Sequence, residues 1–173
     1  MKTQIRILAI AMLLIGISIS TFAQVSATAN GSATVVTPIA ITRISHMNFG
    51  NLAISPNAGS GTIVLSPGGN RQATGGVTLP ANTGTVSAAS FSVSGVPNYT
   101  YSITLPSTAM TIADGNGNNM TVDVFTSDPT PTGLLNGSGS QTLNVGATLN
   151  VGASQPAGSY TSSTPFTVTV NYN

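Results

Sequence analysis

The final run of the chain alternates apolar and polar side chains without exception, and it reads Phe166-Thr-Val-Thr-Val-Asn-Tyr172. Because successive side chains of a β-strand point to opposite faces, this run predicts a strand with a single core face. The side chains on that face are Phe166, Val168, Val170 and Tyr172.

The same alternation recurs in earlier segments, most clearly at residues 91–94, 101–105 and 120–124. Clusters of Gly, Pro and Asn separate these runs, and no stretch has the 3.6-residue period of an amphipathic helix. Roughly eight or nine short strands, with turns about every ten residues, favour an all-β sandwich. We expect one such domain over residues 37–173.

Charged residues make up only 4% of the 173-residue chain, which has 4 Lys and Arg, 3 Asp and Glu, and no Cys. A nucleic-acid-binding protein needs many Lys and Arg to displace counterions from phosphates, so nucleic acid is excluded as a partner. Without Cys there is no thiolate nucleophile, zinc–thiolate site or disulfide. Acid–base catalysis needs titratable groups, which are almost absent, and we expect no enzymatic activity and no cofactor.

Residues 1–23 have the layout of a secretory signal peptide. Lys2 and Arg6 form a basic head, residues 7–20 are nearly all apolar, and Ala23 ends a small-x-small sequence. The apolar run is shorter than the roughly 20 residues of a membrane-spanning helix. We therefore expect a mature chain without a membrane span, exported through the periplasm to the cell surface or the medium. That mature chain has two Arg against three Asp, a net charge of −1.

Residues 25–35 alternate strictly between small apolar residues and Ser, Thr or Asn. Small side chains suit a narrow groove between two sheets. Two interpretations remain open. The segment is either the first strand of a self-complete sandwich or, as part of a donor strand at 24–36, it fills an incomplete neighbouring subunit. The donor face would consist of Val25, Ala27, Ala29, Gly31, Ala33 and Val35.

Several short motifs together resemble the bacterial DUF4402 domain family, which is similar to spore-coat U domains and chaperone–usher pilins. The motifs are Met47-Asn48-Phe49-Gly50, Ala88-Ala89-x-Phe91-x-Val93-x-Gly95, Tyr101-x-Ile103-x-Leu105-Pro106, Gly115-x-Gly117-x-x-Met120-x-Val122, Leu143-x-Val145-Gly146-Ala147-x-Leu149-x-Val151, Gln155-x-x-Gly158-x-Tyr160 and Phe166-x-Val168-x-Val170-x-Tyr172. The resemblance implies an immunoglobulin-like antiparallel β-sandwich of the pilin type, exported as a fimbrial or coat subunit.

Pilins of this type carry an alternating N-terminal donor strand that contains a Gly, which Gly31 matches, and a penultimate aromatic residue, which Tyr172 matches. The resemblance therefore implies assembly by donor-strand exchange. The partners would be copies of this chain or related subunits, a periplasmic chaperone and an outer-membrane usher. Phe166, Val168, Val170 and Tyr172 would form one edge of the groove that accepts the donor.

Few residues could support other chemistry. The sequence from Asp114 to Asn119 has oxygen-bearing residues at alternate positions, as calcium loops do, but it lacks the Gly and Glu of a twelve-residue calcium loop. Asp-Gly and Asn-Gly are typical of hairpin turns, and we expect a turn here. His46 has no second His and no nearby carboxylate in the sequence, so we expect a packed or surface histidine rather than a metal ligand or base.

A second function is compatible with the same fold. A self-complete sandwich could recognise surface glycans or another protein through its loops, with Tyr99, Tyr101 or Tyr160 as stacking residues. Residues 24–35 discriminate between the two functions. Packing of this segment into its own domain would favour a binding module, and its exposure would favour a subunit that donates a strand.

Overall fold

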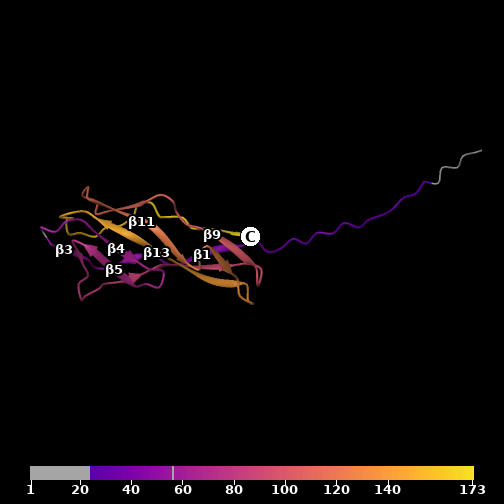
Figure 1. Cartoon of the computed structure of the whole chain (residues 1–173), viewed down its shortest axis with the longest axis horizontal. Coiled ribbons are helices and arrows are strands. Elements are labelled where there is room, and N and C mark those ends of the chain that lie inside the picture. The colour runs from indigo at the N-terminus through magenta and orange to yellow at the C-terminus, as the bar shows by residue number, and fades with distance from the viewer. Residues whose placement is uncertain (1–23, 56) are drawn as a thin grey trace, which may run out of the picture. The chain divides into compact units, whose positions relative to one another are not determined.

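A computed structural model describes residues 24–55 and 57–173. The elements of secondary structure in this part of the chain are all β-strands (Figure 1). The strands pair in antiparallel ladders. The expected all-β, antiparallel class is therefore confirmed. The predicted signal peptide, residues 1–23, lies outside the described residues.

The described residues form more strands than the eight or nine expected, because turns divide several extended segments into pairs of short strands. The strands are β1 (Ala40–Ser45), β2 (Asn48–Phe49), β3 (Ala53–Ile54), β4 (Gly61–Leu65), β5 (Arg71–Gly75), β6 (Val77–Thr78), β7 (Val86–Ser87), β8 (Ala89–Ser94), β9 (Thr100–Thr104), β10 (Met110–Ala113), β11 (Asn119–Asp128), β12 (Thr132–Leu134), β13 (Ser140–Val151) and β14 (Thr169–Tyr172).

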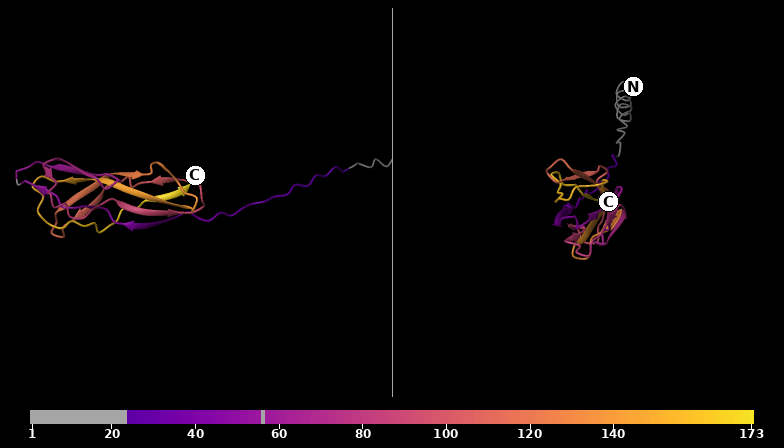
Figure 2. Two further views of the ribbon diagram at one scale, coloured as in Figure 1. Left: turned by 90° about the horizontal axis from the view of Figure 1, so that it is seen from below. Right: turned by 90° about the vertical axis from the view of Figure 1, so that its left-hand side faces the viewer.

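Strand β13 is the centre of the larger sheet. One of its edges pairs with β11, while the other pairs first with β8, over residues 140–145, and then with β4, over residues 147–151. Beyond these neighbours, β1 pairs with β8, β5 with β4 and β10 with β11. The sheet therefore divides into two arms along one edge of β13, and its strands curl into a half-barrel (Figure 2).

The division occurs at Gly146, the residue of β13 between the β8 ladder and the β4 ladder. A Cβ at this position would collide with the carbonyl oxygen of Leu65, where β4 leaves the sheet. Strand β13 continues through Gly146. An irregularity lies on the facing strand, where Val124 of β11 has a φ of 45° and the register shifts between Asp123 and Thr126.

A smaller sheet, in the order β12-β9-β14, contains the C-terminal run. The strand predicted over residues 166–172 is shorter in the structure and spans only Thr169–Tyr172. Thr169 pairs with Thr104, so continuation of the ladder would place Thr167 opposite Pro106. Proline has no N–H to donate, and the ladder therefore stops before it.

The core consists of two clusters that share β13. The first cluster is built mainly from β4, β11 and the second half of β13 and contains Phe49, Ile63, Leu65, Val77, Met120, Val122, Ala147, Leu149 and Val151. The second cluster lies between the β8 arm and the smaller sheet and contains Ala89, Val93, Tyr101, Leu135, Leu143, Val145, Val168 and Val170. Met47 and Phe125 pack against both clusters and join them.

Tyr172 closes one end of the domain with its hydroxyl group. The hydroxyl accepts a hydrogen bond from the Val96 N–H (2.7 Å) and donates one to the Thr37 carbonyl (3.0 Å), which precedes β1. A Cβ on Gly95 would collide with the same hydroxyl, so glycine is required there. The C-terminal strand is thus held to two segments far away in the sequence.

We predict that Gly146→Ala destabilises the domain by about 1–3 kcal/mol, because the added methyl group must displace the backbone of the β4 arm. Gly137→Ala is the matched control, since a Cβ added there would meet no atom within 4 Å and its φ is not positive. Urea unfolding followed by circular dichroism measures both. Equal stability of the two variants would contradict this role of Gly146.

We also predict that Tyr172→Phe lowers the free energy of unfolding by about 1–3 kcal/mol, because a partly buried hydrogen bond to Val96 and an exposed one to Thr37 are lost while the ring remains. Tyr99→Phe is the control. Its ring packs edge-on against Tyr172 at a centroid distance of 5.6 Å, but its hydroxyl has no hydrogen-bond partner among the described residues. The same urea titration should leave Tyr99→Phe within error of the parent protein.

Candidate functional site

A cleft of about 1320 Å³ opens in the domain between two mostly irregular segments, residues 46–55 and residues 154–162. Its floor is apolar and belongs to the first core cluster or to residues packed against it. The floor side chains are Met110, Ile112, Met120, Val122 and Leu149. The described lining residues include no carboxylate, and the cation Arg43 is among them.

One wall of the cleft contains the Met47–Gly50 motif and is shaped by a tight turn. The Asn48 side-chain oxygen accepts a hydrogen bond from the Gly50 N–H (2.8 Å), and Gly50 has a φ of 69°. Glycine adopts this conformation without a steric penalty, and a Cβ here would also meet the carbonyl of Thr83 and the side chain of Val86. The turn separates β2 from β3 and allows Phe49 to enter the core.

The guanidinium group of Arg71 holds the same wall in place. Its Nη1 donates to the carbonyls of Phe49 (2.5 Å) and Asn51 (2.6 Å), and its Nη2 donates to the carbonyl of Thr83 (3.4 Å). The guanidinium group therefore binds three backbone carbonyls, two from residues 49–51 and one from Thr83. Sequence reasoning missed this role, because nothing in the sequence around Arg71 indicates that its partners lie 12 to 22 residues away.

The opposite wall is held by hydrogen bonds at both ends of residues 155–161. Ala113 and Thr161 exchange a pair of backbone hydrogen bonds at 2.9 Å. This pair joins the end of the wall to the last residue of β10. The Tyr160 hydroxyl donates to the Pro156 carbonyl (2.8 Å) and accepts from Gln155 (3.0 Å). Gln155 also reaches the Asn119 carbonyl. The Gln155-to-Tyr160 motif quoted from the sequence thus builds this wall.

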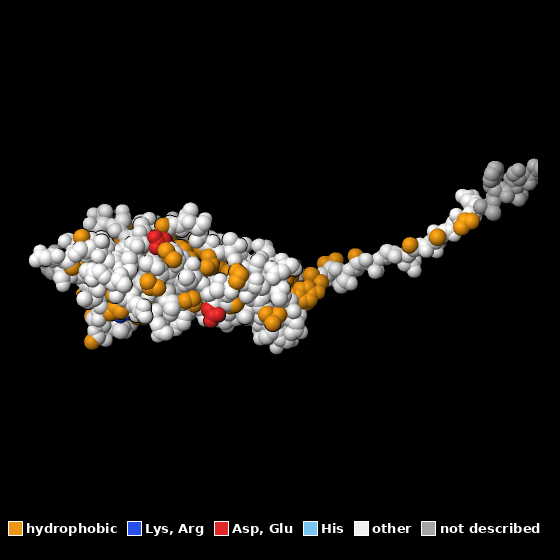
Figure 3. Space-filling view, in the orientation of Figure 1, with side chains coloured by type: hydrophobic (Ala, Val, Ile, Leu, Met, Phe, Trp, Pro, Cys, Tyr) orange, Lys and Arg blue, Asp and Glu red, His pale blue; other side chains and the backbone are white. Residues whose placement is uncertain are grey.

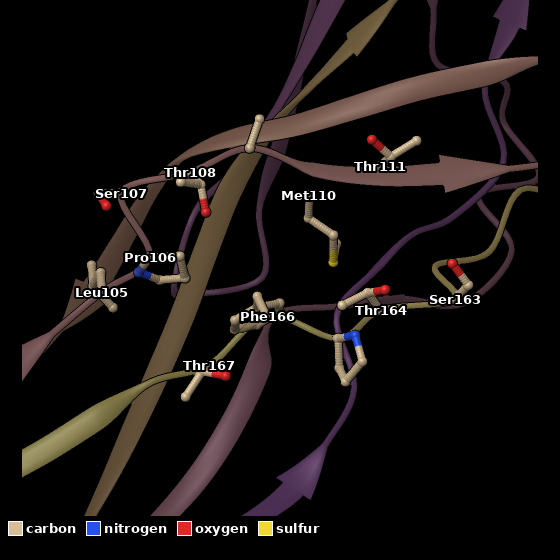
Figure 4. Close-up of a pocket in the computed structure, with 12 residues that line it drawn as sticks. Leu105, Pro106, Ser107, Thr108, Met110, Thr111, Ser163, Thr164, Phe166 and Thr167 are labelled. Carbon is tan, nitrogen blue, oxygen red and sulfur yellow. The ribbon is translucent and has the colours of Figure 1, made fainter.

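A second hollow of about 530 Å³ adjoins the cleft, because Met110 and Pro165 line both. Figure 4 shows Met110 extending towards Phe166 and Thr164, which lie on the other side of the hollow. Phe166 is one of the predicted groove-edge residues, and it packs against Phe91 and Phe125. The cleft and this hollow, which we call the groove, together follow residues 154–167.

The strands that continue the two walls each have one unpaired edge. In the described part of the chain, β1 forms a ladder only with β8, and β14 forms one only with β9. Of the predicted groove-edge residues, Val168 and Val170 are buried, whereas Phe166 and Tyr172 are partly buried. An unpaired strand edge presents free N–H and C=O groups that another extended segment can bind.

Residues 24–35 form a unit separate from the domain that begins at Val36. This unit contains no strand in its described part, and all of its described side chains are exposed, with Val25 at 93% and Val35 at 97%. The predicted donor residues, which also include Ala27, Ala29, Gly31 and Ala33, therefore lie in an exposed segment that carries no charge. Their role as donors stays a prediction.

Of the remaining sequence-based candidates, Asp114 lies in a turn and His46 lines the cleft. The Asp114 carboxylate accepts hydrogen bonds from Asn116 and Asn118 within its own loop, as expected for a turn, and the side-chain hydrogen bond from Asn118 lowers its pKa. Among the described residues, no group of three His, Cys, Asp or Glu could hold a metal ion. His46 is exposed at the mouth of the cleft.

Asp123 is partly buried and Tyr101 is fully buried. Asp123 has one buried carboxylate oxygen without a hydrogen-bond partner. Tyr101, suggested above as a stacking residue, is fully buried, and burial raises its pKa, so it cannot stack on an external ligand. Its hydroxyl donates to Gln141 (2.8 Å). Tyr99 is 44% exposed and Tyr160 is tied into the cleft wall.

The surface around these features is largely neutral. Figure 3 shows one face of the protein with a few isolated charged side chains on a largely uncharged surface. None of the elements in residues 24–55 and 57–173 is a helix with the length and apolar character of a membrane span.

We predict that Arg71→Met loosens the cleft wall, lowering the free energy of unfolding by about 1.5–3 kcal/mol, the range for hydrogen bonds to a charged group. Hydrogen–deuterium exchange should rise in residues 47–52 and 82–85. Arg43→Met removes the same charge from an exposed position and is the control. If both variants exchange alike, the three hydrogen bonds do not hold this wall.

Comparison with known proteins identifies a family. No curated protein sequence matches the chain. Residues 39–172 match the family described as "Domain of unknown function (DUF4402)", which covers the domain from the residue before β1 to the end of β14. The match includes both walls of the cleft and all of the motifs quoted from the sequence. The chain therefore belongs to the DUF4402 family.

Proposed function

We propose that this chain is a secreted, non-enzymatic structural subunit of a bacterial surface filament or coat, in which copies join by donor-strand exchange. The domain would be an immunoglobulin-like sandwich of the pilin type that lacks one strand. Residues 24–35 of one copy would supply that strand to the groove of the next copy.

The acceptor side of this proposal is the groove. Irregular side walls, rather than a strand, cover its apolar floor, whose side chains include Met110 and Leu149. The edges of β1 and β14 are unpaired among the described residues. An inserted strand could bury its own small apolar side chains against Met110 and Ile112, which are only partly buried, and hydrogen-bond to a free edge. Burial of apolar area and main-chain pairing are the two sources of affinity in β-strand addition.

The donor side is the exposed segment 24–35. Its alternation places six small residues on one face, and a small face can approach a sheet closely. Neither the segment nor the described lining of the cleft contributes a carboxylate, so insertion leaves no carboxylate buried without a partner. The observation that carries the proposal is this pairing of an apolar, open groove with an exposed, alternating, uncharged segment in one chain.

Export and assembly follow from the same features. The predicted signal peptide would direct the chain to the periplasm, where a chaperone would cover the groove until an outer-membrane usher brings two subunits together. A soluble protein with an open apolar groove and free edges is prone to uncontrolled association, so temporary cover is physically required.

Complementary variants of the mature chain, residues 24–173, test the proposal. Ala29→Lys places a charge on the donor face, and Met110→Lys places one on the groove floor. We expect each variant alone to stay monomeric in size-exclusion chromatography with light scattering, because a lone charge is costly to bury. Mixed together, they should form a heterodimer through the intact donor of one and the intact groove of the other.

Thr28→Lys and Thr121→Lys are the matched controls. Thr28 lies beside Ala29 on the opposite face of the donor segment, and Thr121 is an exposed residue of β11, the strand paired with β10, that lines neither part of the groove. Both should form oligomers as the parent does. Circular dichroism establishes that the Met110→Lys domain is folded. The proposal fails if the parent stays monomeric at high concentration, or if donor-face and opposite-face lysines have the same effect.

A further inference from the structure

The chain contains three Asn-Gly pairs, at Asn30, Asn116 and Asn136. In such a pair the backbone nitrogen of Gly can attack the side-chain carbonyl carbon of Asn, because Gly has no side chain to obstruct the approach. The reaction needs a flexible backbone and a free side-chain amide. Local structure therefore determines which of the three pairs reacts.

Asn30 meets both requirements. It lies in the exposed segment 24–35, which forms no strand, and its side chain has no hydrogen-bond partner among the described residues. A Cβ built on Gly31 would meet no atom within 4 Å, so the described residues leave open space around the Gly31 backbone, whose nitrogen must reach the Asn30 side chain.

Asn136 has the opposite environment. Its side-chain oxygen accepts hydrogen bonds from the N–H groups of Ser138 (2.9 Å) and Ser140 (3.1 Å), and its Nδ2 donates to the Ser140 hydroxyl (3.2 Å). These bonds close the loop that precedes β13, and the side chain must break them before it can react. Asn116 is intermediate, because its backbone N–H is held by Asp114 in a hairpin turn.

We propose that the Asn30–Gly31 bond is a self-modification site that ends the ability of a subunit to donate its N-terminal strand. The Gly31 nitrogen bonds to Cγ of Asn30, the Cγ–Nδ2 bond breaks, and ammonia leaves with the proton from the Gly31 amide. Water then opens the resulting succinimide at either carbonyl, yielding aspartate or isoaspartate at position 30.

Isoaspartate changes the strand itself. Its chain runs through the former side-chain carbon, so one extra backbone carbon separates residues 25–29 from residues 31–35. Strand pairing depends on a constant spacing and on strict alternation of faces. The two halves of the donor face can then no longer enter one groove in phase. This consequence rests on the proposed function, whereas the modification itself does not.

The first measurement is independent of assembly. The parent mature protein is incubated in mildly alkaline buffer, which favours loss of the Gly amide proton, and peptide mapping by mass spectrometry follows each Asn-Gly pair. We expect Asn30 to react roughly tenfold faster than Asn136 or more, because several hydrogen bonds restrain Asn136. Equal rates at the two positions would overturn the proposal.

The second measurement tests the consequence. Aged and fresh parent protein are separated into monomers and mixed with Ala29→Lys, which can only accept a strand. Aged protein should form fewer complexes in proportion to its isoaspartate content. Asn30→Gln closes the ring far more slowly, lies outside the donor face and should keep its donor capacity through the same incubation.

Asn30→Asp separates the effect of charge from that of the backbone. It carries the carboxylate on the polar face with normal chain length, so we expect it to donate almost as well as the parent. Loss of donation by Asn30→Asp, or full donation by isoaspartate-containing protein, would overturn the backbone mechanism. If fresh parent protein never donates a strand while Asn30 still deamidates, the proposed function fails and the modification site stands.

Discussion

The architecture of this domain depends on one edge of β13 being shared between two strands. β8 occupies the first half of that edge and β4 the second, and the end of β4 needs the close backbone approach that Gly146 permits. Because of this division, the smaller sheet covers only the half of the large sheet that belongs to the second core cluster. The other half is covered by irregular segments, and the groove lies between them.

Those irregular segments are held by polar contacts that are few and specific. On one side, a single guanidinium group binds carbonyls from two loops, and on the other, a backbone bridge and the Tyr160 hydroxyl fix the wall. Hydrogen bonds of this kind position a wall without filling the space beside it. The cleft between the walls therefore stays hollow, and Met110 and Ile112 on its floor are only partly buried.

The near absence of charge links the surface to the proposed assembly. Soluble domains usually protect strand edges with Lys and other charged residues. Here the edges of β1 and β14 lack a ladder on one side, and the segment that precedes the domain is neutral as well. Features that would be a liability in a monomer are suitable in a subunit that adds extended segments to its neighbours.

The sequence by itself determined the all-β class, the core faces of β8 and β9, and the family, because alternation and turn residues are local signals. The alternation predicted over residues 120–124 holds for Met120 and Val122 but fails at Val124, which is 68% exposed where the register of β11 shifts. Only the tertiary structure decided that the C-terminal strand starts at Thr169, since Pro106, two residues beyond the end of β9, stops the ladder. It also decided where the cleft lies and that Arg71 holds its wall. Contacts between residues far apart in the chain leave no periodic trace in the sequence, so their partners become visible only after folding.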